Sequence, residues 1–90
     1  MKTEGQYKAQ KGLIKVSVDE EGGIIQKVVI SGDFFLYPED NLWLLERKLV
    51  GTKLIREDLL AKVKDFYKDE RIFSPGVTPE DFVEALLKAA

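Results

Sequence analysis

Histidine and cysteine are both absent from this 90-residue chain. Without cysteine there is no disulfide framework and no thiolate zinc site. Without histidine the commonest general base and every Ser-His or Cys-His nucleophile are excluded. The chain also has no apolar run near the roughly 18 residues that a membrane span needs. Its polar start, MKTEGQYKAQKG, lacks the apolar core of a secretory signal. These absences predict a soluble, cytoplasmic protein without a membrane span.

A strong charge of one sign is missing as well. The net charge of −2 creates no field that would attract a phosphate backbone, so we expect no nucleic-acid partner. The 44% hydrophobic and 33% charged residues are typical of a globular protein. The length predicts one domain over residues 1–90, whose polar residues 1–6 are expected to be frayed.

A β-hairpin is the first regular structure that the pattern predicts. From Leu13 to Asp19 apolar and polar residues alternate, as in a half-buried strand. The glycine-containing 20-EEGG-23 supplies a turn, and the β-branched run 24-IIQKVVIS-31 follows. Strict alternation would place apolar residues on both faces of this second strand: Ile24, Val28 and Ile30 inside, Ile25 and Val29 outside.

Three helices are predicted in the rest of the chain. The first begins at Pro38 and ends before Gly51, with Leu42, Leu45 and Leu49 on its core side. The second covers about 56–70, and the third begins after the N-cap of 78-TPED-81 and runs almost to the terminus. The order ββααα predicts an α+β fold, a small antiparallel hairpin sheet packed against three helices.

No catalytic, cofactor-binding or metal-binding residue is predicted. The acidic clusters at 19–21 and 39–40 are interpreted as solvated or helix-capping groups. The paired glycines Gly22 and Gly23 precede a strand, whereas a phosphate-binding loop leads into a helix N-terminus.

Surplus apolar surface is what the sequence offers instead. The connection contains 34-FFLY-37, and Trp43 lies about 100° away from the core stripe of its helix. These residues either fill the small core or dock a partner, since buried aromatics dominate tight protein association. The sequence does not decide which of the four residues 34–37 face inward. The residues predicted to contact a partner are Phe34, Phe35, Tyr37 and Trp43, with Lys8 and Lys11 as a weaker second choice.

Three segments together identify a family resemblance. The segments 7-YKAQKGLIKVSVD-19, 28-VVISGDFFLYPEDNLWLLERKLVG-51 and 76-GVTPEDFVEALL-87 resemble the C-terminal accessory domain of lipoate–protein ligases. The Gly-Asp-Phe-Phe sequence after the second strand is the most specific element. The match covers about residues 7–88. In such ligases this small domain usually follows the catalytic domain in one chain. Here it has its own initiator methionine, so the resemblance implies the free-standing accessory subunit of a split, archaeal-type ligase.

The resemblance implies a function without a catalytic residue in this chain. A catalytic subunit would bind lipoate and ATP with Mg, form lipoyl-AMP and pass the lipoyl group to a lysine. The acceptors would be the lipoyl domains of 2-oxoacid dehydrogenases or the glycine cleavage protein. The accessory chain would form a heterodimer with the catalytic subunit and support the activation step. Two alternatives stay open: a protein-interaction module unrelated to lipoylation, and a small enzyme that uses carboxylates alone.

Overall fold

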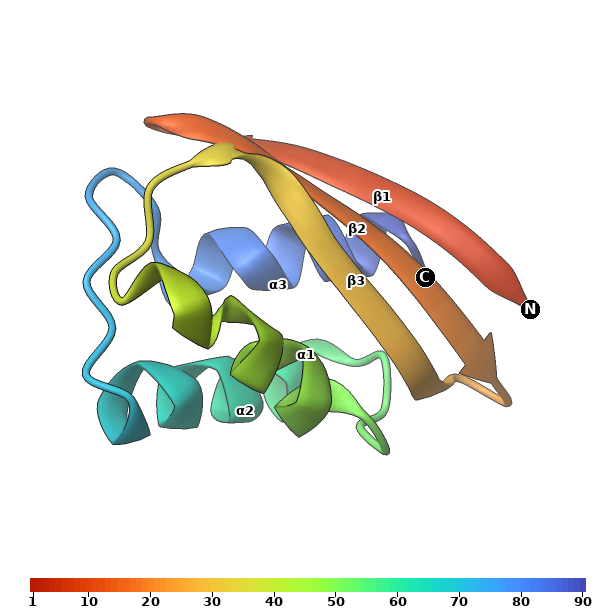
Figure 1. Cartoon of the computed structure of the whole chain (residues 1–90). Helices are drawn as coiled ribbons and strands as arrows, with labels where there is room; N and C mark the ends of the chain where they lie inside the picture. Colours follow the sequence, from red (N-terminus) through yellow and green to blue (C-terminus); the bar gives the residue numbers. More distant parts are fainter.

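A three-stranded antiparallel sheet, in the order β1-β2-β3, carries three helices on one face (Figure 1). The computed structural model describes all residues from 1 to 90. Its elements are β1 (Lys2–Ala9), β2 (Gly12–Glu21), β3 (Ile24–Phe34), the short 3-10 helix η1 (Glu39–Asn41), α1 (Leu42–Leu49), α2 (Arg56–Asp69) and α3 (Pro79–Lys88). The predicted α+β class and its three helices are confirmed, and the sheet has one strand more than the predicted hairpin.

The additional strand corrects the expectation that residues 1–6 are frayed. Strand β1 pairs with β2 in a continuous ladder from Lys2 opposite Asp19 to Ala9 opposite Gly12. Its inner side faces α3, whose backbone lies so close that a Cβ on Gly5 would be 2.6 Å from the carbonyl oxygen of Ala85. Because this approach requires a glycine at position 5, and Thr3 precedes it on the same side, the inner side of β1 lacks the regular apolar alternation that identifies a half-buried strand.

A β-bulge corrects the predicted faces of β3. The register shifts between Asp19, which pairs with Lys27, and Glu20, which pairs with Ile25, so Gln26 is an additional residue. Such a residue reverses the alternation of side chains beyond it. Ile25, predicted on the outer face, is therefore fully buried, whereas Ile24, predicted inside, is 36% exposed.

The helices begin and end close to the predicted positions. In α3 the backbone N–H of Asp81 donates to Thr78 Oγ1 (3.2 Å) and the N–H of Thr78 donates to Asp81 Oδ2 (2.8 Å), which forms the predicted capping box. Helix α1 ends at Leu49, and Gly51 adopts a φ of +85° that favours glycine. Its Leu45 and Leu49 are fully buried, as the stripe predicts. No helix of the chain is both long and apolar enough to cross a membrane.

The core lies between the inner face of the sheet and the three helices. Its fully buried large side chains come from every layer: Ile14, Val18 and Ile25 from the sheet, Leu45 and Leu49 from α1, Leu59, Val63 and Phe66 from α2, and Phe82, Val83 and Leu86 from α3. Burial of this kind contributes about 1.5–3 kcal/mol for each large apolar side chain. The core thus fixes the ends of the strands, and with them the loops that carry the exposed aromatics.

Candidate partner-binding surface

The segment 34–37, which begins with the last residue of β3, sends its side chains alternately inward and outward. Leu36 is 5% exposed and belongs to the core, and the half-buried ring of Phe34 meets Phe82 edge-on at 5.5 Å between centroids. Phe35 is 62% exposed and Tyr37 is 43% exposed. The segment is therefore divided between two environments: Phe34 and Leu36 pack into the core, while Phe35 and Tyr37 face solvent and stay candidates for partner contact.

Three aromatic rings form a continuous exposed group, called here the aromatic row: Phe35, Tyr37 and Phe73. The rings of Phe35 and Tyr37 are almost parallel, at 4° and 6.5 Å between centroids. Tyr37 stacks on Phe73 at 24° and 6.4 Å. Both separations lie in the range of favourable aromatic pairs, which is about 4.5–7 Å. Phe73 is 65% exposed, so the row presents apolar surface that this chain itself does not cover.

Backbone hydrogen bonds hold the two halves of the aromatic row together. The N–H of Tyr37 donates to the carbonyl of Phe73 (2.8 Å), and the N–H of Phe73 donates to the carbonyl of Tyr37 (2.9 Å). This isolated antiparallel bridge joins the connection after β3 to the loop between α2 and α3. Sequence reasoning missed Phe73, whose only signal was an aromatic residue in the loop 71-RIFSPGV-77.

The loop that carries Phe73 is also anchored by side chains. The hydroxyl groups of Tyr67 and Ser74 are 2.7 Å apart, and Ser74 Oγ donates to the carbonyl of Val77 at 2.7 Å. Burial raises the pKa of the Tyr67 phenol, although its hydrogen bond with Ser74 acts in the opposite direction. The anchors hold the aromatic row in place before any partner arrives.

The two predicted lysines differ in their relation to the aromatic row. The N–H of Lys11 donates to the carbonyl of Gly76 (3.1 Å), and the aliphatic stem of Lys11 lies against Gly76. Lys11 therefore lies beside the loop that carries Phe73. Lys8 is exposed on β1, opposite Leu13, and no contact connects it with the row. Neither lysine takes part in an ion pair.

Trp43 is a separate exposed feature on α1. It is 49% exposed, in agreement with its predicted position off the core stripe. The guanidinium of Arg47 lies 5.4 Å from the centroid of its ring, within the distance of a cation–π interaction. Trp43 has no stacking contact with the aromatic row, so the structure leaves it as an independent candidate for partner contact.

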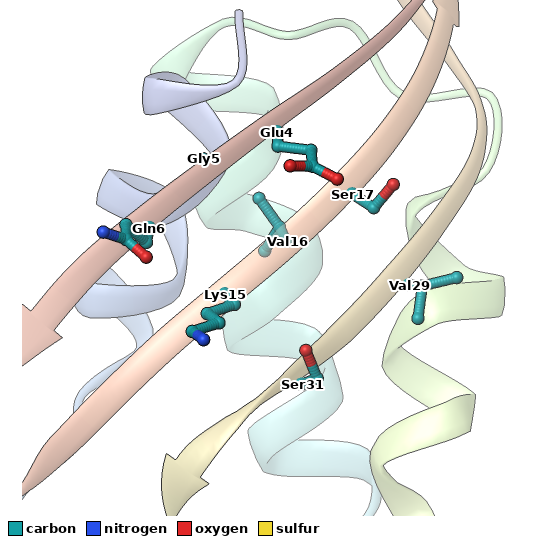
Figure 2. A pocket seen from close by; sticks show the side chains of 8 residues that line it. All are labelled: Glu4, Gly5, Gln6, Lys15, Val16, Ser17, Val29 and Ser31. Atoms are coloured by element: carbon teal, nitrogen blue, oxygen red, sulfur yellow. The ribbon is translucent and has the colours of Figure 1, made fainter.

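The open face of the sheet is polar, which removes it from the candidate apolar surfaces. Figure 2 shows the side chains of Glu4, Lys15, Ser17 and Ser31, which come from three neighbouring strands and line a hollow of about 390 Å³. Val29 is 47% exposed on this face, whereas Ile25, which was predicted beside it, is buried because of the bulge. Nowhere do three or more Asp or Glu side chains converge as metal ligands.

Comparison with known proteins agrees with the fold and with the segments identified in the sequence. Residues 2–86 match the family described as "Bacterial lipoate protein ligase C-terminus". The chain belongs to this family. It is 45% identical over 80 residues to lipoate-protein ligase A subunit 2 of Thermoplasma acidophilum, which is 89% of this chain and 82% of the relative. The resemblance found in the sequence is therefore confirmed.

A solved structure shares the fold. It describes an archaeal lipoylation system from Thermoplasma acidophilum, a bi-partite lipoate protein ligase and its E2 lipoyl domain. One of its chains matches with a TM-score of 0.86 and 43% identity, over 96% of this chain and 94% of the other. Residues 2–86, which match the family, contain β1 and most of α3, which packs on it.

Proposed function

We propose that this chain is the non-catalytic accessory subunit of a cytoplasmic lipoate–protein ligase. It would form a heterodimer with the catalytic subunit and support the ATP-dependent activation of lipoate to lipoyl-AMP. The observation that carries the proposal is the likeness of nearly the whole chain to a ligase subunit 2 and to one chain of a bi-partite ligase.

The aromatic row supplies the contact that such a heterodimer requires. Exposed aromatic rings that are already held in place lose little conformational entropy on binding, which favours their use as interface anchors. Phe35 and Phe73 are the most exposed rings of the row. Lys11, which lies beside the same loop, would contribute a positive charge at the rim of the interface. Trp43 would be a further contact if the interface extends to α1.

A subunit without a catalytic group can still accelerate adenylation. The reaction profits from a closed, water-excluding site with fixed hydrogen-bond donors. If the accessory chain binds the closed form of the catalytic subunit more tightly than the open form, it shifts the population toward the closed form. Each tenfold difference in affinity contributes about 1.4 kcal/mol to this shift. ATP, its magnesium ion and lipoate would be bound by the catalytic subunit.

The test separates the two half-reactions. Lipoate-dependent pyrophosphate release is measured with the catalytic subunit alone, with this chain alone and with both. Transfer to a lipoyl domain is measured separately from pre-formed lipoyl-adenylate. We expect the chain alone to be inactive, adenylation to require both chains, and transfer to depend much less on this one. Pyrophosphate release by the purified chain alone would contradict a non-catalytic role. An equal requirement in both half-reactions would indicate acceptor recognition instead.

A further inference from the structure

The outer edge of β3 differs along its length in the hydrogen bonds that it makes. Met1 and Glu20 exchange two backbone hydrogen bonds (2.9 and 2.6 Å). The N–H and C=O groups of Glu20 therefore point toward β1, and those of every second residue along β2 do the same. Since hydrogen-bonded and non-hydrogen-bonded pairs alternate in an antiparallel ladder, the backbone groups of residues 28, 30, 32 and 34 of β3 point away from the sheet. This edge is where another strand could pair.

The first two-thirds of that edge are blocked by the chain itself. Just before the bulge in the chain, the N–H of Ile25 donates to the carbonyl of Thr52 (2.9 Å), and the carbonyl of Ile25 accepts from the N–H of Gly51 (2.8 Å). Further along, the N–H of Ile30 donates to the carboxylate of Glu46 at 2.6 Å. A carboxylate that occupies an edge N–H prevents a second strand from adding there. Val28 lies between these two blocked positions, so a second strand could not pair with several successive outward-facing residues there.

The last part of the edge is open. The outward N–H and C=O groups of Gly32 and Phe34 have no partner within the chain. Beside them lies a pocket of about 390 Å³ whose apolar lining includes Phe34, Leu36 and Leu42. Phe35 of the aromatic row also lines this pocket, and Glu39 is its only charged residue. An open strand edge next to an apolar pocket is the arrangement that binds extended peptides by strand addition.

We propose that an extended segment of the partner protein adds to the β3 edge at Gly32–Phe34. The segment would place a bulky apolar side chain in the pocket and a lysine or arginine near Glu39. Backbone pairing would supply orientation, and the pocket and Glu39 would supply specificity. This inference deepens the proposed function. It rests on that function only for the identity of the partner, which is the catalytic subunit of the ligase.

Amide hydrogen exchange tests the pairing directly. The ¹⁵N-labelled chain is followed by NMR with and without saturating catalytic subunit, while complex formation is measured separately by sedimentation. We expect exchange at Gly32 and Phe34 to slow by about tenfold or more, because new hydrogen bonds protect these amides. The outward amides of Glu4 and Gln6 on β1 are the internal control and should not change.

A pair of charge variants tests the side-chain part of the proposal. Glu39→Arg should weaken the complex by about tenfold, because it repels the incoming cation. Asp40→Arg makes the same charge change at a residue that does not line the pocket and should change affinity by less than about twofold.

A complex that leaves Gly32 and Phe34 unprotected, or equal effects of the two variants, would overturn strand addition without affecting the proposed function. Failure to form any complex would overturn both. Protection that appears in the chain alone and rises with its concentration would identify a second copy as the occupant.

Discussion

Tyr37 and Phe73 exchange two backbone hydrogen bonds and stack their rings at 6.4 Å, although they lie on different loops. This single relationship joins the connection after β3 to the loop before α3. A rigid pair of loops places Phe35 at one end of the aromatic row and Phe73 at the other. Preorganisation of this kind reduces the entropy cost of docking, and for that reason the row is the first target for substitution.

Truncation of the aromatic row should weaken the heterodimer while the fold persists. We expect Phe35→Ala and Phe73→Ala each to raise the Kd for the catalytic subunit by about tenfold or more, as for aromatic interface anchors. Both rings are more than half exposed, so the free energy of unfolding should change little. The matched control is Ile55→Ala, which removes an apolar side chain of 50% exposure outside the row. The affinities are measured by calorimetric titration. If Phe35→Ala weakens binding no more than Ile55→Ala does, the aromatic row is not the main contact.

Trp43 reports on whether the interface reaches α1. In the free chain its 49% exposure and the nearby Arg47 predict a fluorescence emission of a partly solvated indole. If the catalytic subunit covers α1, the emission should shift to shorter wavelength during titration, because the indole loses water. An emission unchanged at saturation, in a complex verified by sedimentation, would limit the interface to the aromatic row. Where the partner contains tryptophan, the variant Trp43→Phe supplies the background to subtract.

The helices could be predicted because their signals are local. Thr78 and Asp81 form a capping box that four consecutive residues specify, and Gly51 ends α1 with a positive φ. The spacing of Leu45 and Leu49 identifies the buried side without knowledge of what packs there. Each of these features depends on residues within one or two helical turns, so one sequence suffices to recognise it.

The errors have non-local causes. Strand β1 was missed because Gly5 interrupts the apolar alternation on its inner side, and the close approach of the α3 backbone requires a glycine there. The orientation of Ile25 was wrong because a bulge at Gln26 depends on the pairing with β2. Phe73 was missed because its stacking partner Tyr37 belongs to another loop. Within the candidate surface, the sequence indicated the segment 34–37 but not the alternation that sends Phe35 outward and Phe34 inward.

The close approach of α3 to β1 predicts that Gly5→Ala destabilises the protein. The added methyl would lie 2.6 Å from both the carbonyl oxygen of Ala85 and the amide nitrogen of Ala89. Since these are backbone atoms, the helix itself must move, and overpacking of this kind costs about 1–3 kcal/mol. Gln6→Ala, on the exposed side of the same strand, is the control and should change the free energy of unfolding by less than about 0.5 kcal/mol. Equal urea midpoints for wild type and Gly5→Ala would show that α3 is not seated on β1 as described.

Tyr67 should make the protein less stable in alkaline solution. Burial raises the pKa of its phenol above the ordinary value of 10.0. Between the ordinary pKa and the folded-state pKa, the folded chain therefore retains a proton that the unfolded chain releases. Its contribution to stability is therefore complete below pH 10.0 and decreases as the pH rises toward the folded-state pKa.

Tyr67→Phe loses the hydrogen bond with Ser74, which costs about 0.5–1.5 kcal/mol at neutral pH. The variant has no phenol to ionise, so the difference in stability between wild type and variant should narrow as the pH rises beyond the ordinary pKa. Ser74→Ala removes the same hydrogen bond but keeps the buried phenol, and it should retain the alkaline loss of stability. Urea unfolding of the three proteins from neutral to alkaline pH gives the result. A difference between wild type and Tyr67→Phe that stays constant with pH would show that ionisation of Tyr67 is not coupled to unfolding.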